Sequence, residues 1–172
     1  MDAAPPVRLV PWSEGDFALL RAANAPEVTA YLGGPETEER LARRHRRYVE
    51  MSGGPKEAGR MYRVVLLPGE VPVGTIGYWP LTWDGERVYE TGWSVLPGFQ
   101  RRGVATAAAG AVVALAREAR MYRYLHAYPS VRNAASNAVC RKAGFELRGE
   151  RLFEYPAGRL TPSNDWRFDL EA

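Results

Sequence analysis

Hydrophobic and polar positions alternate, or gather in short apolar groups, over several segments of the chain that end near Pro or Gly. Such segments are typical of β-strands. The pattern predicts strands over residues 7–10, 61–67, 71–79, 88–96, 122–128, 145–155 and 165–170. In the intervening stretches, apolar residues recur at helical spacing. There we expect helices that follow Ser13, cover residues 24–32, follow Thr37, and cover residues 103–120 and 134–143.

The order of these segments indicates an α+β fold. The turn Pro68-Gly69-Glu70 has the chemistry that joins two adjacent antiparallel strands, so we expect a mostly antiparallel sheet. A chain of 172 residues with 46% hydrophobic and 25% charged residues can bury one substantial core, and we expect a single domain over residues 1–172. The last strand can pair within the chain or across a dimer, so monomer and homodimer both stay open.

The chain lacks features typical of export, membrane insertion or a protein-made metal site. Its first twelve residues hold an acid and three prolines but no apolar stretch, so we expect no cleaved signal peptide and a cytoplasmic location. The apolar run 104–116 falls short of the ~20 residues that a membrane span needs. Cys140 is the only cysteine, and His45 and His126 lie far apart. We therefore expect no membrane contact, no disulfide and no metal.

A net charge of +3 suits an anionic ligand or a nucleic acid, so the distribution of the charge matters. Its densest point is a group of five arginines from Arg40 to Arg47, which follow three glutamates in one helical segment. Acids in the first turn and bases near the end complement the helix dipole, and a solvated helix face is the favoured interpretation. Contact with RNA or an acidic partner rests on these arginines alone, so a nucleic-acid partner is not expected.

The segment after the predicted strand 88–96 has the residues of an anion site. Pro97-Gly98 ends the strand, and Gln100-Arg101-Arg102-Gly103 leads into an alanine-rich helix. Free N–H groups and the positive dipole end at a helix start attract phosphate, and Gly103 lets a ligand approach the backbone closely. The motifs of two other phosphate-binding classes are missing. No Gly-x-Gly-x-x-Gly opens an early βαβ unit, and no Lys-Ser or Lys-Thr follows a glycine loop.

Two segments in this order resemble the GNAT superfamily of N-acetyltransferases. Residues 100–105, QRRGVA, are similar to its Gln/Arg-x-x-Gly-x-Gly/Ala loop. Residues 133–145, NAASNAVCRKAGF, are similar to the Asn-x-x-Ser-x-x-x-x-x-Lys-x-Gly-Phe helix of the branch that includes the ribosomal-protein alanine N-acetyltransferases. The resemblance implies a mixed, mostly antiparallel central sheet that is splayed between strands 4 and 5, with helices on both faces.

The resemblance also implies acetyl-CoA as the acyl donor. Backbone groups of Trp93, Ser94 and Val95 would pair with its pantetheine arm, and Asn133 would reach the arm from the other side. Pro97 lacks an N–H, so we expect it to end the ladder and let strands 4 and 5 separate. The other contacts are expected near the phosphates and the nucleotide, from Arg101, Arg102, Gly103, Val104, Ala105, Thr106, Asn137, Arg141 and Lys142. The last two are equally consistent with solvated helix charges.

Acyl transfer to an amine needs a deprotonated amine, a stabilised oxyanion and a proton for the leaving thiolate. Glu90 occupies the place where this branch often has a glutamate, so it is the candidate base, and a carboxylate paired with Arg87 is the alternative. A backbone N–H near Val95 is the candidate oxyanion donor. Ser136 is the candidate proton donor or else a helix cap. Cys140 is expected in the core rather than as a nucleophile.

The acceptor is expected to be a primary amine, either a small molecule or a protein N-terminus. Its pocket is predicted between the early helices and the loop over residues 155–166. Trp79, Trp83, Asp84 and Glu86 form an aromatic and acidic group that suits an ammonium, or else contribute to a packed core. Two alternatives stay open: transfer of another acyl group such as succinyl, and a noncatalytic acyl-CoA-binding module.

Overall fold

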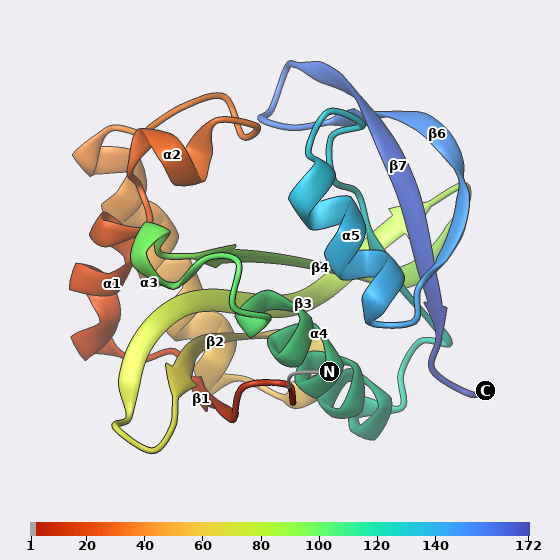
Figure 1. Cartoon of the computed structure of the whole chain (residues 1–172). Coiled ribbons are helices and arrows are strands. Elements are labelled where there is room, and N and C mark those ends of the chain that lie inside the picture. Colours follow the sequence, from red (N-terminus) through yellow and green to blue (C-terminus); the bar gives the residue numbers. More distant parts are fainter. Residues whose placement is uncertain (1–2) are drawn as a thin grey trace.

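Seven strands form one sheet in the computed structural model, which describes residues 3–172 (Figure 1). The strands are β1 (Val7–Pro11), β2 (Arg60–Leu66), β3 (Val71–Trp83), β4 (Glu86–Val95), β5 (Tyr124–Ala127), β6 (Glu146–Glu154) and β7 (Leu160–Asp169). Their order is β1-β2-β3-β4-β5-β7-β6, and all neighbours are antiparallel except β4 and β5. The mostly antiparallel sheet is confirmed, and the last strand pairs within the chain.

Helices cover both faces of this sheet, as expected (Figure 1). They are α1 (Phe17–Ala22), α2 (Pro26–Thr29), α3 (Glu38–Gly53), α4 (Val104–Ala119) and α5 (Ala134–Lys142). Successive side chains of a strand point to opposite faces, so Tyr78 packs in one apolar cluster and Trp79 in the other. The Tyr78 cluster includes the buried residues of α4 and α5, and the Trp79 cluster includes Leu20 of α1 and Leu41 of α3.

Small side chains let α4 lie close to the sheet. Ala108, Ala109 and Ala116 are at most 1% exposed, and α4 contacts β1, β3 and β4. The helix begins after Gly103, whose φ of 78° is left-handed backbone that a glycine adopts without a steric penalty. The position of the helix start relative to the strands is therefore fixed by packing along the whole helix.

Two strands are longer than the sequence pattern predicts. β3 continues to Trp83, and β7 begins at Leu160 rather than at residue 165, so half of the expected loop 155–166 is strand. Thr161-Pro162-Ser163-Asn164 reads as turn chemistry, because proline cannot donate a ladder hydrogen bond. This part of β7 pairs with β6 on one side and meets only the irregular segment after β5 on the other. There Pro162 serves as an acceptor, since its carbonyl takes a hydrogen bond from Val131 N at 3.0 Å.

The central sheet opens between β4 and β5. Their parallel pairing comprises only Tyr89 with Leu125 and Glu90 with His126, whereas β4 stays paired with β3 as far as Val95. The expectation that Pro97 separates these strands is wrong, because they have already diverged at Thr91. The strand that leaves is β5, which ends at Ala127, and the chain after it forms a bridge with β7 instead.

The outer halves of β6 and β7 form a two-stranded ribbon that extends beyond the sheet. Residues 160–165 of β7 pair with β6 and not with β5. The tip of the ribbon reaches the segment after α2, where a Cβ added to Gly33 would lie 3.2 Å from Pro156 Cγ (Figure 1). This contact brings the ribbon against the early helices, although the two are more than 120 residues apart in the sequence.

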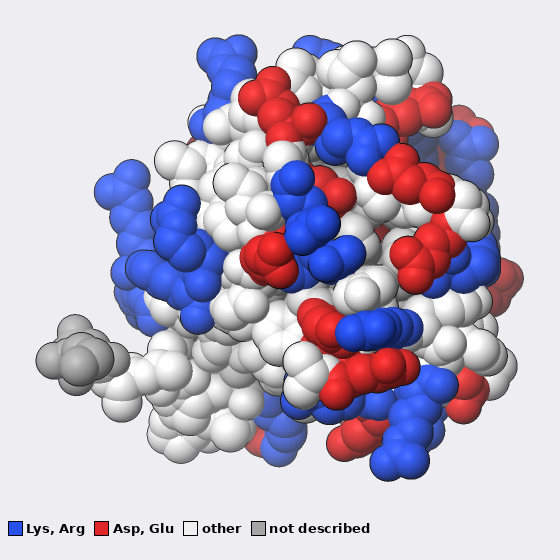
Figure 2. Space-filling view, turned by 90° about the vertical axis from the view of Figure 1, so that its right-hand side faces the viewer, with Lys and Arg blue, Asp and Glu red and all other residues white. Residues whose placement is uncertain are grey.

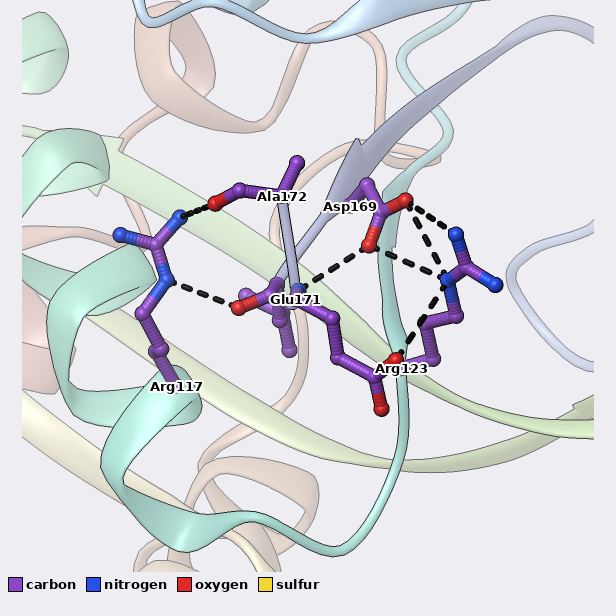
Figure 3. Close-up of polar contacts among 6 residues, drawn as sticks. Arg117, Arg123, Asp169, Glu171 and Ala172 are labelled. Atoms are coloured by element: carbon purple, nitrogen blue, oxygen red, sulfur yellow. Dashed lines mark hydrogen bonds and ion pairs between the residues drawn. The ribbon is translucent and has the colours of Figure 1, made fainter.

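The C-terminal residues are attached to α4 and β5 (Figure 3). Arg117 of α4 donates from Nε to the carbonyl of Leu170 at 2.8 Å and from a terminal nitrogen to that of Ala172 at 3.4 Å. Arg123, just before β5, pairs with Asp169 at 2.8 Å. These contacts connect the end of β7 to the helix that begins at Gly103.

We predict that Arg117→Ala lowers the free energy of unfolding by about 1 kcal/mol, because the substitution removes two hydrogen bonds to backbone carbonyls. Urea unfolding at neutral pH measures the change. Arg46→Ala, which removes an exposed arginine of α3, serves as the control and should shift the midpoint little. An equal effect of both substitutions would contradict the role given to Arg117.

Candidate active site

The opening between β4 and β5 places free strand backbone beside a carboxyl group. Glu90 belongs to the last residue pair before the two strands diverge. Beyond it, residues 91–95 of β4 pair with β3 on one edge, while β5 no longer pairs with the other edge. An open strand edge offers N–H and C=O groups to an extended ligand. The geometry therefore fits a thin amide-bearing arm lying between the two strands.

Glu90 is partly buried on the face covered by α1 and α3. Its Oε2 accepts a hydrogen bond from Trp79 Nε1 at 2.9 Å. Burial raises the pKa of Glu90 to about 7, and the hydrogen bond from Trp79 offsets part of that rise. Arg87, the partner considered as an alternative, instead donates to Thr82 and Tyr122. Glu90 is thus a carboxyl group that can gain or lose a proton near neutral pH.

The start of α4 has the geometry of an anion site. Gly103 is the N-cap, and the first N–H groups of a helix have no partner within it. A Cβ on Gly103 would meet Pro5 Cδ at 3.2 Å. Arg101 and Arg102 are exposed beside this turn, whereas the Val104 side chain is 2% exposed and leaves only its backbone available. These residues fit a pyrophosphate group, which would take backbone N–H groups and two guanidinium charges.

Side chains on β4 between Glu90 and α4 are held by neighbouring residues. Ser94 Oγ lies 2.7 Å from Thr75 Oγ1, and Trp93 packs on the opposite face with the α4 cluster. Gln100 Nε2 donates to the carbonyl of Val95 at 3.0 Å. Gln100 therefore fixes the loop before Gly103, a role that sequence reasoning did not assign to it.

The predicted residues of α5 divide into two groups. Asn133 Oδ1 caps the helix by accepting from Ser136 N at 3.1 Å, and Ser136 is half-buried. Asn137 is 8% exposed, and its side chain makes four hydrogen bonds, donating to two carbonyls and accepting from Asn164 and Trp166. An amide has no further capacity after four bonds, so Asn137 positions the helix. The Asn137 side chain therefore has no free donor or acceptor for the expected contact with the nucleotide.

The remaining predicted residues of α5 are two exposed charges and one buried thiol. Arg141 and Lys142 are exposed, and the guanidinium of Arg141 lies 5.8 Å from the Trp166 ring centre. Cys140 is fully buried, and burial raises the pKa of its thiol to about 12. A thiol with that pKa is protonated at neutral pH, so Cys140 is a core residue and not a nucleophile.

A small cavity lies between the early helices, the sheet and the ribbon tip. Its volume is about 30 Å³, and its lining residues come from both ends of the chain: Leu20, Ala23, Val28, Thr29, Leu32, Gly34, Glu36, Arg44, Thr75, Ser94 and Tyr155. The cavity lies between the early helices and Tyr155, in the region where the sequence predicts the acceptor pocket. Arg44 does not lie on the outer face of α3 as the sequence predicts, because it turns inward to pair with Glu36.

Two members of the aromatic and acidic group at the β3–β4 turn are bound to other side chains. Asp84 forms a two-point ion pair with Arg151 of β6, at 2.7 Å for each bond, which lowers the pKa of Asp84. Trp83 Nε1 donates to Asp165 at 3.1 Å. These contacts join β3, β6 and β7, so Asp84 and Trp83 support the ribbon and are not free to bind an ammonium.

Sequence reasoning missed a buried pair beside Glu90. His126 Nδ1 lies 2.6 Å from Asp165 Oδ1, and the two residues are 5% and 4% exposed. His126 is also the strand neighbour of Glu90 in the β4–β5 register. No local motif predicts this pair, because its members are 39 residues apart and come together only through the pairing of β7 with β5.

Charges on the face that carries β6 and β7 are intermixed rather than of one sign (Figure 2). Arg148 pairs with Glu146, and Arg123 pairs with Asp169. On α3, four of the five arginines are exposed, and Arg43 lies 3.9 Å from Glu39. Within residues 3–172, no group of three His, Cys, Asp or Glu side chains is placed to hold a metal ion. No helix in that range is long and apolar enough to cross a membrane.

A family model described as an acetyltransferase (GNAT) domain matches residues 7–146. A comparison with curated proteins found no match.

Solved structures are similar to this chain over nearly its whole length. A GNAT-family acetyltransferase from Bacillus anthracis has a TM-score of 0.77 and 21% identity, covering 99% of this chain and 98% of that one. An acetyltransferase from Salmonella typhimurium that modifies the N-terminal serine of ribosomal protein L7/L12 has a TM-score of 0.75 and 17% identity, with 95% and 94% covered. Spermidine N-acetyltransferase from Vibrio cholerae, solved with CoA and spermine, has a TM-score of 0.75 and 15% identity, with 96% of each chain covered. These likenesses show a shared fold.

We predict that Glu90 makes the folded protein less stable as pH rises from about 5 to 8. The unfolded carboxyl loses its proton near its ordinary pKa of 4.5, whereas the folded one holds it to about 7. The folded state therefore binds more protons in this window, and raising the pH removes about 2–3 kcal/mol of stability. Urea unfolding at pH 5 and pH 8 measures this loss.

Glu90→Gln should remove most of that pH dependence and be more stable than the parent at pH 8. Glu86→Gln alters an exposed acid of the same strand and should retain the parental pH dependence. If Glu90→Gln kept the full loss between pH 5 and pH 8, the raised pKa of Glu90 would not be its cause.

Proposed function

The chain belongs to the GNAT acetyltransferase family and is an N-acetyltransferase; from this premise we propose that it moves the acetyl group of acetyl-CoA directly to a primary amine, with Glu90 as the general base. Both substrates would be bound together, and no acetyl-enzyme would form. The full burial and raised pKa of Cys140, the only cysteine, support direct transfer.

The observation that carries this proposal is the position of Glu90 at the point where β4 and β5 diverge. A general base works best when its pKa is near the working pH, and burial raises the pKa of Glu90 to about 7. The small cavity and Glu90 lie on the same face of the sheet, because the cavity is lined by Thr75 and Ser94, which share the alternation of Glu90 along β3 and β4. An amine in this cavity therefore approaches the opening from the side of the base.

In the proposed reaction, Glu90 takes a proton from the acceptor ammonium, and the free amine nitrogen forms a bond to the thioester carbonyl carbon. A backbone N–H of residues 91–95 stabilises the resulting oxyanion, since this edge of β4 is not paired with β5. The carbon–sulfur bond then breaks, the attacking nitrogen loses its second proton and the thiolate gains one. Ser136, half-buried at the start of α5, is the proposed donor to the sulfur, and its hydroxyl would regain a proton from the attacking nitrogen.

We propose that acetyl-CoA lies in the opening between β4 and β5, with its phosphates at the start of α4. The pantetheine arm would pair with the backbone of residues 93–95. The pyrophosphate would contact the turn formed by Arg101, Arg102, Gly103, Val104, Ala105 and Thr106. Arg141 and Lys142 are exposed on the last turn of α5 and would attract the nucleotide phosphate. The continuous sheet from β1 to β7 supports the proposal that residues 1–172 form one domain.

The acceptor class is proposed only as a primary amine, either a small molecule or a protein N-terminus. The similar solved structures include an enzyme that modifies an N-terminal serine and a spermidine N-acetyltransferase. Both of these acceptors, the N-terminal serine and spermidine, carry a primary amine. Because the pyrophosphate site does not contact the acyl tail, a larger acyl donor such as succinyl-CoA is the second candidate. A noncatalytic acyl-CoA-binding module is not favoured, because burial raises the pKa of Glu90 to a value suited to proton transfer near neutral pH.

We predict that Glu90→Gln lowers kcat/KM by a factor of about 10² to 10⁴ while CoA binding is retained. Thiol release from acetyl-CoA measures the rate, with kanamycin, spermine and peptides with N-terminal Ala or Ser as acceptors. In the parent, kcat/KM should rise with pH and level off above about 7, because Glu90 must be ionised to accept the proton.

Glu50→Gln, an exposed acid on α3, should leave the rate unchanged. Full activity of Glu90→Gln would remove Glu90 from the mechanism. Tight CoA binding by the parent without turnover of acetyl-CoA or succinyl-CoA on any of these amines would favour the noncatalytic module.

We predict that Gly103→Glu weakens acetyl-CoA binding at least tenfold. The substitution adds a negative charge at the proposed phosphate site and a Cβ at a φ of 78°, where side chains are strained. Calorimetric titration measures the dissociation constant. Gly53→Glu adds the same charge at an exposed glycine with open space around it and should bind normally. Equal binding by both variants would place the cofactor elsewhere.

A further inference from the structure

We infer that His126 and Asp165 form a buried proton-holding pair that sets the charge of Glu90, which makes His126 a positioning residue for acetyl transfer. The inference rests on the proposed function of Glu90 as the base. It concerns two buried titratable side chains for which the proposed mechanism otherwise has no use.

The pair is held rigidly inside the fold. His126 Nδ1 and Asp165 Oδ1 are 2.6 Å apart, and the second carboxylate oxygen of Asp165 accepts from Trp83 Nε1 at 3.1 Å. The carboxylate thus faces two nitrogen atoms, so Nδ1 of His126 carries the hydrogen between it and the carboxylate, and Nε2 is left as the basic nitrogen of the ring. The ring of Tyr128 stacks on the imidazole with centres 5.6 Å apart, which fixes the plane of the ring.

The register places this pair next to the proposed base. Glu90 and His126 are direct neighbours on the parallel strands β4 and β5, and their side chains leave the sheet on the same face. They form the last pair before the strands diverge. His126 therefore stands at the inner end of the opening, on the strand next to the one that carries the proposed base.

Two polar neighbours of His126, Asp84 and Tyr128, keep a constant charge near neutral pH. Asp84 is ion-paired with Arg151, which lowers the pKa of Asp84. Burial raises the pKa of the Tyr128 hydroxyl far above its usual value, so it stays protonated. The titratable and charged groups that surround the imidazole on β4, on β5, in the β3–β4 turn, on β6 and on β7 are Glu90, Tyr124, Tyr128, Asp84, Arg151, Asp165 and Arg167.

Charge balance explains how the pair would act. With a neutral imidazole the pair carries one negative charge, which disfavours a second negative charge on Glu90. With a proton on Nε2 the pair is neutral, and Glu90 ionises more easily. A proton that passes from the Glu90 carboxyl to Nε2 leaves a carboxylate on Glu90 and an imidazolium bound to Asp165, so it restores the base without adding net charge.

The kinetic test uses His126→Asn, because the Asn amide N–H occupies roughly the place of Nδ1–H and can still bond Asp165 while it cannot titrate. We expect the rise of kcat/KM with pH to move upward by about one pH unit. The rate would then be several-fold lower at pH 6.5 and nearly parental at pH 9. A purely structural role would lower the rate by the same factor at every pH, and this result would overturn the inference.

The matched control is His45→Asn. His45 is also a buried histidine, 6% exposed, and its Nδ1 accepts a hydrogen bond from Trp12 at 3.0 Å. It lies on α3, outside the opening between β4 and β5. The same substitution there should leave the pH of the rise unchanged. A shift of similar size in both variants would show that the effect does not depend on proximity to Glu90.

A second test needs neither an acceptor nor the histidine variant to fold. Coupling between two titrating groups is reciprocal, so Glu90→Gln should lower the pH at which the His126 imidazole signals titrate in NMR spectra. Removing the Glu90 charge makes the imidazolium less favourable, and His45 serves as the internal reference. An unchanged His126 titration would overturn the inference.

These results separate the inference from the proposed function. Amine acetylation with no coupling between Glu90 and His126 would contradict the inference and leave the proposed function standing. Coupling without any acetylation of the amines named above would contradict the proposed function. The predicted role of His126 in acetyl transfer requires both results to be positive.

Discussion

The structure depends on the short contact between β4 and β5. These strands share only two residue pairs, yet they join the N-terminal and C-terminal parts of the sheet. Each partner is secured elsewhere: β4 by its ten-residue pairing with β3, and β5 by β7. Because the contact ends at Glu90 and His126, the sheet opens there without losing its core. The opening exposes one backbone edge of β4 and leaves a carboxyl group at its inner end, which together define the candidate active site.

Burial is the second physical factor that shapes this site. A carboxyl group removed from water is harder to ionise, so its position beside Trp79 on the covered face raises the pKa of Glu90 to about 7. Burial also raises the pKa of the Cys140 thiol, but there the result is a group that stays protonated and does not react. The ion pair between Glu36 and Arg44 shows a third outcome, in which two charges enter the cavity wall together and compensate each other. The same desolvation thus produces a base, an inert thiol and a neutral pocket wall.

The sequence predicted the regular elements well where local chemistry determines them. Thr37 caps α3 and Gly103 begins α4, because each position requires a particular residue type at a helix start. At α5 the cap is Asn133, whereas the sequence suggested Ser136 for that role. It predicted less well where pairing partners decide. Because of Pro162, the first half of β7 was predicted as a loop. Pro97 was expected to separate β4 from β5, but the two strands diverge earlier, after Glu90. Asn137 was expected at the cofactor but is saturated by four hydrogen bonds inside the fold, a fact that depends on where β7 runs.

The sequence by itself determined the α+β class, the family and the position of the glycine turn before α4. These follow from local periodicity and from motifs whose residues are close together in the chain. Only the tertiary structure decided which side chains surround Glu90 and how they alter its proton affinity. His126 with Asp165, Arg44 with Glu36, and Gly33 with Pro156 meet because β7 inserts between β5 and β6 and the ribbon folds over the early helices. Desolvation and ion pairing act over a few ångströms of space, and no spacing along the chain encodes those distances.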